Sequence, residues 1–306
     1  MDYDPVKRDA ASIFNCCRPA RVLFFRMLNV LLLRSWHVRK EVKRWLRTAP
    51  AGARVLDAGS GFGQYVWFVS RLRKDLHVTG IDVKEEEIAI CNRFFGVPSG
   101  TGEGTVSGSV NADRGPAPSG QPDEASLNGN RLQPGRVSFR KADLLGFSEP
   151  ETYDLALCID VLEHIEDDVK VMANLCRSLK PGGVLIISTP SDKGGSDVHR
   201  EGDRSFIGEH VRDGYSSSEI ADKLLAAGFS AAGSRYTYGR WGHISWYLSM
   251  KLPVKILNRG RIFFLVLPVY YIFTLPFALL LNFFDLWTRN RMGTGLLVRA
   301  VKGAVP

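Results

Sequence analysis

Residues 55–63 read VLDAGSGFG, an apolar run that ends in an acid and then passes through three alternate glycines. The pattern predicts a buried strand ending at Asp57, a tight turn through Gly59, Gly61 and Gly63, and a helix after the turn. Glycines at such points permit positive φ and let the backbone approach a ligand closely, and the start of the following helix favours a negative group. The stretch therefore indicates a ligand-binding turn, with a purely structural turn as the lesser alternative.

Two more acids end predicted strands. Asp82 follows Asp57 by 25 residues, where an acid can accept hydrogen bonds from ribose hydroxyls across the crevice of a doubly wound sheet; a helix cap is its alternative role. Asp143 ends the next strand, where it could accept from an adenine amino group or serve as a turn residue. A dinucleotide site would require G-x-G-x-x-G, but Gln64 directly follows Gly63, so the third glycine is misplaced for a dinucleotide.

Strands and helices alternate around this stretch. Apolar runs predict strands at 54–57, 77–82, 136–141, 153–160 and 184–188. Helical periodicity predicts helices at 63–74, 84–95 and 167–179. Because this alternation is typical of βαβ units, the expected fold class is α/β, with a doubly wound parallel sheet.

Residues 99–135 interrupt the alternation. Gly, Pro and Ser make up 17 of these 37 residues, and none is aromatic. Such a segment buries too little apolar surface to offset the entropy of ordering, and the cost of closing a loop grows only slowly with its length. We therefore expect a disordered surface loop inserted into the sheet domain.

Together these motifs resemble the class I S-adenosylmethionine-dependent methyltransferases, from about residue 54 to residue 229 with a final strand near 296–301. Four elements match in the family's order: VLDAGSGFG at 55–63, the strand-end Asp82, the turn at Asp143, and LKPGGVLIIS at 179–188. The four are highly specific together, although each alone is not. The resemblance implies a Rossmann-like seven-stranded sheet and S-adenosyl-L-methionine as the cofactor.

The resemblance also implies roles for single residues. The glycines of the turn at 59–63 would hold the amino-acid end of the cofactor, with Asp57 oriented nearby. Asp82 would contact the ribose, and Asp143 with Leu144 would contact the adenine. These residues form the expected cofactor site.

Residues 158–168 read CIDVLEHIEDD and resemble the D/E-x-L-E-H-[IV] segment of small-molecule methyltransferases, including those that make ubiquinone and menaquinone. The resemblance implies that Asp160 faces the cofactor and that Glu163 and His164 face the methyl acceptor. Histidine has an unperturbed pKa of about 6.5, which suits His164 to remove a proton from a phenol or enol; a hydrogen bond to a neighbouring loop is an equal alternative. Three metal ligands from one turn make poor geometry, so no metal is expected.

Residues 262–284 are 23 residues without a charge, long enough to cross a bilayer, which takes about 20. The implied fold ends in an antiparallel pair of strands at 232–238 and 296–301. Both ends of the intervening segment must then lie on the same side of any membrane, which excludes a single crossing. Pro268 and Pro276 are expected to break the run, since proline removes a helix hydrogen bond, so a bent or paired helical arrangement follows.

The apolar segment has basic flanks and nearby Trp and Tyr residues of the kind found at headgroup level. We expect it to dock on a membrane surface; a soluble cap over the acceptor pocket and a re-entrant span are the alternatives. The expected organisation is an amphipathic helical extension at 1–50, a methyltransferase domain at 51–238 plus 296–306, and an apolar helical insertion at 239–295. The extension is expected to pack as a lid rather than to contact lipid.

Composition agrees with a globular protein: 45% of the 306 residues are hydrophobic and 24% are charged. The formal net charge is +8, and the Lys and Arg residues cluster near the N-terminus and around the apolar segment. This placement fits an anionic membrane surface better than nucleic acid. Five cysteines without a C-x-x-C spacing indicate a reducing compartment and no zinc site.

The expected function is therefore methyl transfer to an apolar small molecule, such as a quinone precursor or a lipid. The enzyme would be peripheral or monotopic at the cytoplasmic face of a membrane, or alternatively cytoplasmic. A methyltransferase for a soluble metabolite or glycan, with the apolar segment as a pocket cap, is one alternative. An inactive cofactor-binding scaffold at the membrane is the alternative from another class.

Overall fold

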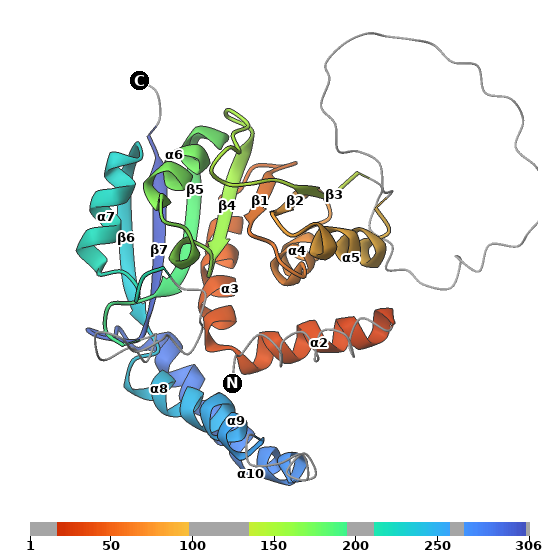
Figure 1. The fold of residues 1–306 in the computed structure, drawn as a ribbon, viewed down its shortest axis with the longest axis vertical. Helices are drawn as coiled ribbons and strands as arrows, with labels where there is room; N and C mark the ends of the chain where they lie inside the picture. Colours follow the sequence, from red (N-terminus) through yellow and green to blue (C-terminus); the bar gives the residue numbers. More distant parts are fainter. Residues whose placement is uncertain (1–16, 98–134, 195–210, 258–265, 304–306) are drawn as a thin grey trace, which may run out of the picture.

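The computed structural model describes residues 17–97, 135–194, 211–257 and 266–303. Its centre is a seven-stranded sheet with helices on both faces, preceded by helices from the N-terminal extension (Figure 1). The expected fold class, including the helical extension and the helical insertion before the last strand, is confirmed. The loop expected at 99–135 lies outside the described residues except for Gly135.

The sheet has the strand order β3-β2-β1-β4-β5-β7-β6. Its first five strands are parallel, and β7 runs antiparallel between β5 and β6. The bounds are β1 Arg54–Ala58, β2 His77–Asp82, β3 Val137–Lys141, β4 Tyr153–Ile159, β5 Leu179–Pro190, β6 Phe229–Thr237 and β7 Gly295–Lys302. The chain order reverses between β1 and β4, so the crevice at the carboxyl ends of these two strands is the place where such sheets bind ligands.

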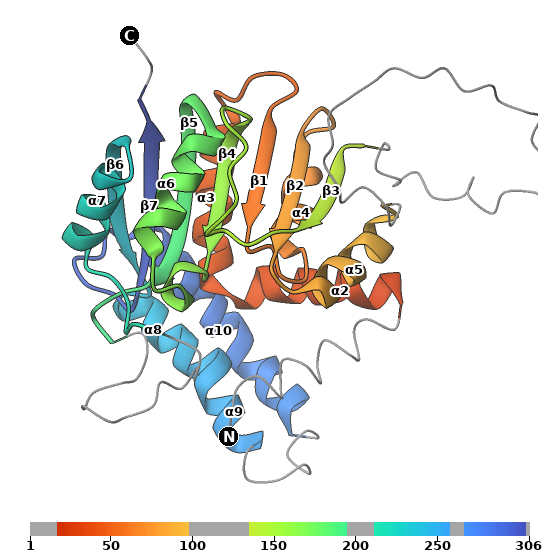
Figure 2. The same cartoon turned by 45° about the horizontal axis from the view of Figure 1, so that its top comes forward.

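Two apolar cores lie on the two faces of the sheet, and Figure 2 shows helices on both faces. One face is covered by α3 Leu33–Leu46, α4 Gln64–Ser70 and α5 Glu85–Phe95. The other is covered by α6 Asp168–Ser178 and α7 Ser217–Ala226. The strands carry buried residues on both faces, which is why they read as nearly continuous apolar runs rather than alternating ones.

The N-terminal extension is helical from Arg18. Helix α2, Arg18–Leu31, is joined to α3 by Leu32, whose backbone is extended. Both views show α2 lying across the carboxyl ends of β1 and β2 (Figures 1 and 2). The extension therefore reaches the edge of the sheet where the expected cofactor residues lie.

The segment between β6 and β7 forms a helical hairpin. Its first arm consists of α8 Arg240–Trp246, the π-helical η3 Tyr247–Lys251 and α9 Leu252–Leu257, and its second arm is α10 Leu267–Trp287. Thr237 pairs with Gly295 in the sheet, so the hairpin leaves and re-enters at one point, as the antiparallel pairing predicts.

The expected breaks at the two prolines do not occur. Pro268 lies in the first turn of α10, where a missing N–H removes no helix hydrogen bond, and Pro276 lies inside a helix that continues through it. Side-chain hydrogen bonds join the two arms of the hairpin, such as that from Tyr271 Oη of α10 to the Ser249 carbonyl of η3 at 2.8 Å. The hairpin is thus paired, as expected, but α10 is one helix.

Candidate functional site

The glycine turn after β1 has the backbone geometry that its sequence predicts. Gly59, Gly61 and Gly63 have φ values of 79°, 47° and 81°. A Cβ atom built on Gly59 would lie 2.3 Å from Cγ2 of Val161, in the segment after β4. The turn therefore comes into direct contact with the carboxyl end of β4, and only glycine fits there.

Asp82 fixes this turn from the end of β2. Its Oδ2 accepts a hydrogen bond of 2.8 Å from the Gly61 N–H, and its Oδ1 accepts one of 2.9 Å from the Lys84 N–H. The N–H groups of Gly59 and Ser60 both donate to the Ile81 carbonyl at 2.9 Å. Asp82 thus stands beside the glycine turn and stays partly exposed, as a residue that contacts a ligand would.

Asp57 is buried beneath the turn and lacks a full set of partners. It is 2% exposed, and its Oδ2 has no hydrogen-bond partner among the described residues. Burial raises the pKa of this carboxyl to about 7, with a smaller rise from the charge of Asp82 and an opposing effect of a hydrogen bond from the Val66 backbone. A cationic or N–H-donating ligand would supply the missing partner, so this site fits the amino end of the expected cofactor.

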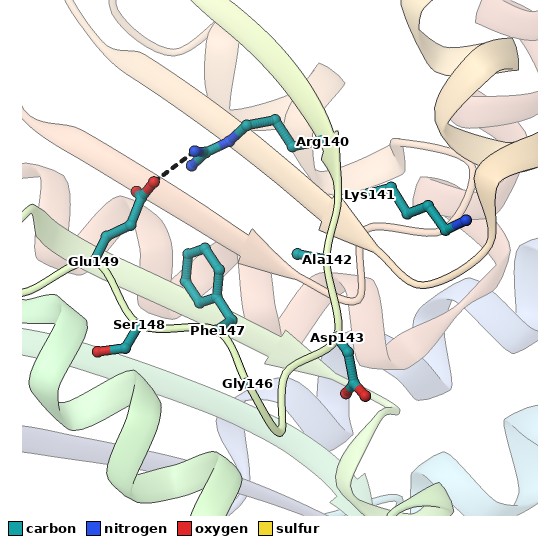
Figure 3. A pocket seen from close by; sticks show the side chains of 8 residues that line it. All are labelled: Arg140, Lys141, Ala142, Asp143, Gly146, Phe147, Ser148 and Glu149. Carbon is teal, nitrogen blue, oxygen red and sulfur yellow. Dashed lines mark hydrogen bonds and ion pairs between the residues drawn. The ribbon is translucent and has the colours of Figure 1, made fainter. Parts of the chain in front are cut away.

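Asp143 and Leu144 follow β3 at the same edge of the sheet. Asp143 is exposed, and its Oδ1 accepts from the Leu145 N–H at 2.9 Å, while Leu144 belongs to the apolar core. A cavity of about 430 Å³ lies beside this loop, and Figure 3 shows Arg140 facing Glu149 there. Of the expected cofactor residues, only Asp143 lines this cavity, so it is not the cofactor crevice as a whole.

The segment after β4 holds the expected acceptor-side residues. Asp160 has φ 53°, uncommon for a residue with a side chain, and its N–H donates to the Ser188 carbonyl at 2.8 Å. Glu163, in the short 3₁₀ helix η2 Leu162–His164, is 1% exposed and accepts from Thr189 Oγ1 at 3.1 Å. Burial raises the pKa of Glu163, with the hydrogen bond from its own backbone and the charge of His164 opposing.

His164 is partly exposed, at the surface of the same turn. Its backbone N–H donates to the Val161 carbonyl at 3.0 Å, which closes the turn that also holds Glu163. Its role toward the acceptor and its role as a general base both stay predictions.

The N-terminal helices, expected to pack as a lid, contact the glycine turn and the residues after it, but the sequence did not indicate which of their residues do so. Arg34, at the start of α3, forms an ion pair with Asp160, and its backbone N–H donates to Tyr238 Oη at 3.0 Å. Gln64, directly after the glycine turn, donates to Asn29 Oδ1 of α2 at 3.0 Å. This bond ties the turn to the extension. No local signal pairs these residues, because they are distant in the chain and, of them, only Asp160 lies in a recognisable motif.

Arg21 of α2 also reaches the turn. Its Nη2 donates to the Phe62 carbonyl at 2.6 Å, and its guanidinium lies 5.6 Å from the centre of the Phe25 ring.

In the part of the chain that the structure describes, no group of three or more His, Cys, Asp or Glu side chains is arranged to hold a metal ion.

A seven-stranded sheet of this order, with a glycine turn and strand-end acids at its switch point, defines the fold of class I S-adenosylmethionine-dependent methyltransferases. Residues 34–232 match the methyltransferase domain family, and the chain belongs to that family. The resemblance inferred from the motifs is thereby confirmed, and S-adenosylmethionine is the cofactor of this class.

Relatives and solved structures agree with this assignment. The chain is 29% identical over 145 residues to a ubiquinone biosynthesis O-methyltransferase of Hahella chejuensis, covering 47% of this chain and 45% of that protein. It is 30% identical over 146 residues to the protein of the same name from Xylella fastidiosa, covering 47% and 44%. The matched region thus spans less than half the length of these relatives.

Two solved structures share the fold. A phosphoethanolamine N-methyltransferase 2 of Haemonchus contortus, in complex with S-adenosyl-L-methionine, has a TM-score of 0.54 at 17% identity over 87% of this chain and 52% of that one. The [4+2]-cyclase SpnF has a TM-score of 0.50 at 17% identity over 87% and 82%. Because a cyclase shares this fold, the fold alone does not decide the reaction.

Proposed function

We propose that the protein is a membrane-associated methyltransferase that transfers the methyl group of S-adenosylmethionine to an apolar small molecule, such as a quinone precursor or a lipid. The observation that carries the methyltransferase assignment is the crevice at the ends of β1 and β4, where Asp57 Oδ2 is buried without a partner beneath a glycine-only turn. The names of the quinone-pathway relatives support an apolar acceptor.

The residues around the crevice fit the cofactor. Gly59, Gly61 and Gly63 let the backbone come close to its amino-acid end, Asp57 supplies a carboxylate beneath that end, and Asp82 can accept from the ribose hydroxyls. Asp143 and Leu144 would lie against the adenine. Asp160, which follows β4 and forms an ion pair with Arg34, would face the cofactor.

When bound, the cofactor supplies an activated methyl group on a sulfonium. The protein's main task is then to hold the acceptor in line at short distance, which can supply roughly 7–11 kcal/mol of barrier reduction. His164 is the proposed base that takes the acceptor's proton, worth about 10²–10⁴-fold in rate. Glu163, buried beside it, would orient the imidazole.

We place the protein at the cytoplasmic face of a membrane, as a peripheral or monotopic enzyme. Helix α10 supports this placement: it is 21 residues long and apolar enough to cross a membrane, and only 17% of its most apolar window is buried. A helix of this composition in a protein core would be mostly buried.

Transfer of labelled methyl from S-adenosylmethionine to a membrane lipid extract tests the proposal. Label in the organic phase is the expected result. Label only in water-soluble products would favour the soluble-acceptor alternative. No transfer, despite calorimetric binding of S-adenosylhomocysteine, would favour an inactive scaffold, and no binding of that product would overturn the cofactor assignment itself.

A further inference from the structure

Helix α10 carries its polar residues inward and its apolar residues outward. The buried side holds Asn282 and Asp285, which are 2% and 0% exposed. On the outer side, Phe273 is 76% exposed and Trp287 is 65% exposed. The outer stripe, defined by the exposed large apolar residues, follows helical spacing over the whole helix: Val266, Val269, Ile272, Phe273, Phe277, Leu280, Phe283, Phe284 and Trp287.

On the buried side, Asp285 is hydrogen-bonded to several residues outside α10, whereas Asn282 Oδ1 has no partner among the described residues. Asp285 accepts hydrogen bonds from the N–H groups of Gly239 and Gly242 at 2.8 and 3.2 Å. It also accepts from Asn290 Nδ2 and His37 Nε2, both at 3.0 Å. These contacts fix which side of α10 points inward, so the outer stripe cannot rotate into the interior without breaking them.

The first arm of the hairpin adds to the same apolar exterior. Trp241, Ile244 and Tyr247, at successive helical spacings, are 38%, 38% and 39% exposed. Trp and Tyr side chains are of the kind that sits at the level of lipid headgroups, because one end is apolar and the other polar.

The charges of the hairpin are almost all of one sign. In the described residues 239–257 and 266–294, the only acid is Asp285, which is buried. The basic residues of these ranges are Arg240, Lys251, Lys255, Arg289 and Arg291. Arg240 and the two arginines after α10 are exposed and lie where the hairpin joins the sheet, so its base is positively charged.

Three kinds of surroundings compete for the outer stripe: water, another protein and lipid. Water is unfavourable, because monomers in water rarely expose apolar patches this extensive. A protein interface has an apolar centre with a polar rim, whereas this stripe runs along the whole of α10 and the opposite arm is apolar as well. A bilayer matches both the inverted polarity and the basic base, since anionic headgroups attract Lys and Arg.

We propose that the hairpin seats the protein on an anionic lipid bilayer through the outer stripe of α10, with the basic residues at its base on the headgroups. The pairing of β6 with β7 keeps both ends of the hairpin on one side, which excludes a single crossing, and the proposed contact is monotopic. This inference specifies the membrane contact within the proposed function and does not depend on the identity of the acceptor.

The arrangement has a consequence for the acceptor. The hairpin extends from the carboxyl edge of the sheet, where the cofactor crevice lies, and α2 crosses the same edge (Figures 1 and 2). Helix α2 also exposes three apolar residues on one side, Leu23, Met27 and Val30. A protein seated by the hairpin therefore turns its crevice toward the lipid, and an apolar acceptor reaches it without crossing water.

Flotation of the purified full chain with vesicles tests the membrane contact. We compare vesicles of phosphatidylcholine alone with vesicles that contain about 30% phosphatidylglycerol. The stripe variant carries Phe273→Glu with Phe277→Glu; the conservative variant carries Phe273→Trp with Phe277→Trp. Leu225→Glu is the matched control, because Leu225 is 53% exposed on α7, away from the hairpin.

The expected result is that the wild type, the Trp variant and the Leu225 control float with the anionic vesicles, whereas the stripe variant partitions at least about tenfold less. Arg289→Gln with Arg291→Gln should weaken binding to the anionic vesicles only. Flotation of the stripe variant like the wild type would overturn the proposal. A wild type that leaves vesicles alone and elutes as a dimer, which the stripe variant converts to a monomer, would assign the stripe to a second copy instead.

Calorimetry with S-adenosylhomocysteine on the same proteins keeps this result separate from the enzyme assignment. All variants should bind the product equally, because the substituted residues lie outside the crevice. Loss of binding in every protein, wild type included, would contradict the methyltransferase proposal and leave the flotation result standing.

Discussion

At the scale of single residues, Asp57 combines features that rarely persist without a ligand: burial, an unpaired oxygen and a pKa raised to about 7. The raised pKa means that the folded protein binds a proton more tightly than the unfolded chain does. This carboxyl therefore contributes stability that is complete below the ordinary value of 3.8 and is lost as the pH rises through about 7.

Replacement Asp57→Asn should remove this dependence. Without cofactor, the variant should gain stability relative to the wild type as the pH rises from about 4 to 8, by an amount on the order of a few kcal/mol at about 1.4 per pKa unit. Wild-type affinity for S-adenosylmethionine should rise over the upper part of that range, and the variant should bind weakly at every pH. Asp222→Asn, at an exposed position of α7, is the control, and an equal pH profile for both variants would contradict the role of Asp57.

Substitution of His164 should affect the methyl-transfer step and not the binding of the cofactor product. His164→Ala should lower turnover by about 10²–10⁴-fold if the imidazole removes the acceptor's proton, with little change in the dissociation constant of S-adenosylhomocysteine. His77→Ala, at an exposed position on the amino end of β2, should leave both quantities unchanged. Unaltered turnover of the His164 variant across neutral pH would retire the general-base role.

At the scale of elements, the site depends on the contact between the glycine turn and the segment after β4. Strand bounds agree with the sequence prediction to within a residue or two for β1, β2, β3 and β4, because their apolar runs and terminal acids are local features. The predicted helix at 63–74 is shorter, ending at Ser70, and β5 begins at Leu179 rather than 184 because its first residue pairs with Tyr153.

Gly59→Ala tests the contact between these elements. The new Cβ would meet Val161 at 2.3 Å, and φ would stay at an unfavourable 79°, so we expect a loss of about 1–3 kcal/mol in the free energy of unfolding and weaker cofactor binding. Denaturant unfolding and calorimetry measure the two effects. Gly233→Ala, where a Cβ meets nothing within 4 Å, should be neutral, and adding Val161→Ala should recover part of the stability; no recovery would show that the clash is not the cause.

At the scale of the whole molecule, one buried cluster ties the hairpin to the sheet domain. Arg235 Nη2 donates to His37 Nδ1, and His37 Nε2 donates to Asp285, an arrangement that requires neutral imidazole. Burial lowers the pKa of His37 and opposes the charged form, despite the hydrogen bond with Asp285. The cluster joins α3, β6 and α10, three elements that are far apart in the sequence.

Asp285→Ala should loosen the hairpin rather than the sheet. Removing the carboxylate leaves the His37 ring and two backbone N–H groups without their acceptor, and each buried donor left unsatisfied costs about 1–3 kcal/mol. Hydrogen exchange should accelerate in α8 and α10 and stay slow in β1 and β4. Asp192→Ala removes an ion pair with Lys193 whose two side chains are 31% and 46% exposed and should have little effect; equal exchange in both variants would contradict the anchoring role of Asp285.

The sequence by itself determined the sheet, the turn and the strand-end acids. Each of these features depends on a few consecutive residues: an apolar run, alternate glycines, or an acid at the end of a strand. Tertiary structure alone decided that Arg34 pairs with Asp160 and that His37 pairs with Asp285, 248 positions away. It also decided which side of α10 faces outward. Periodicity cannot mark an outer side in a helix that is apolar nearly all round, and tertiary hydrogen bonds, those of Asp285 among them, set its rotation.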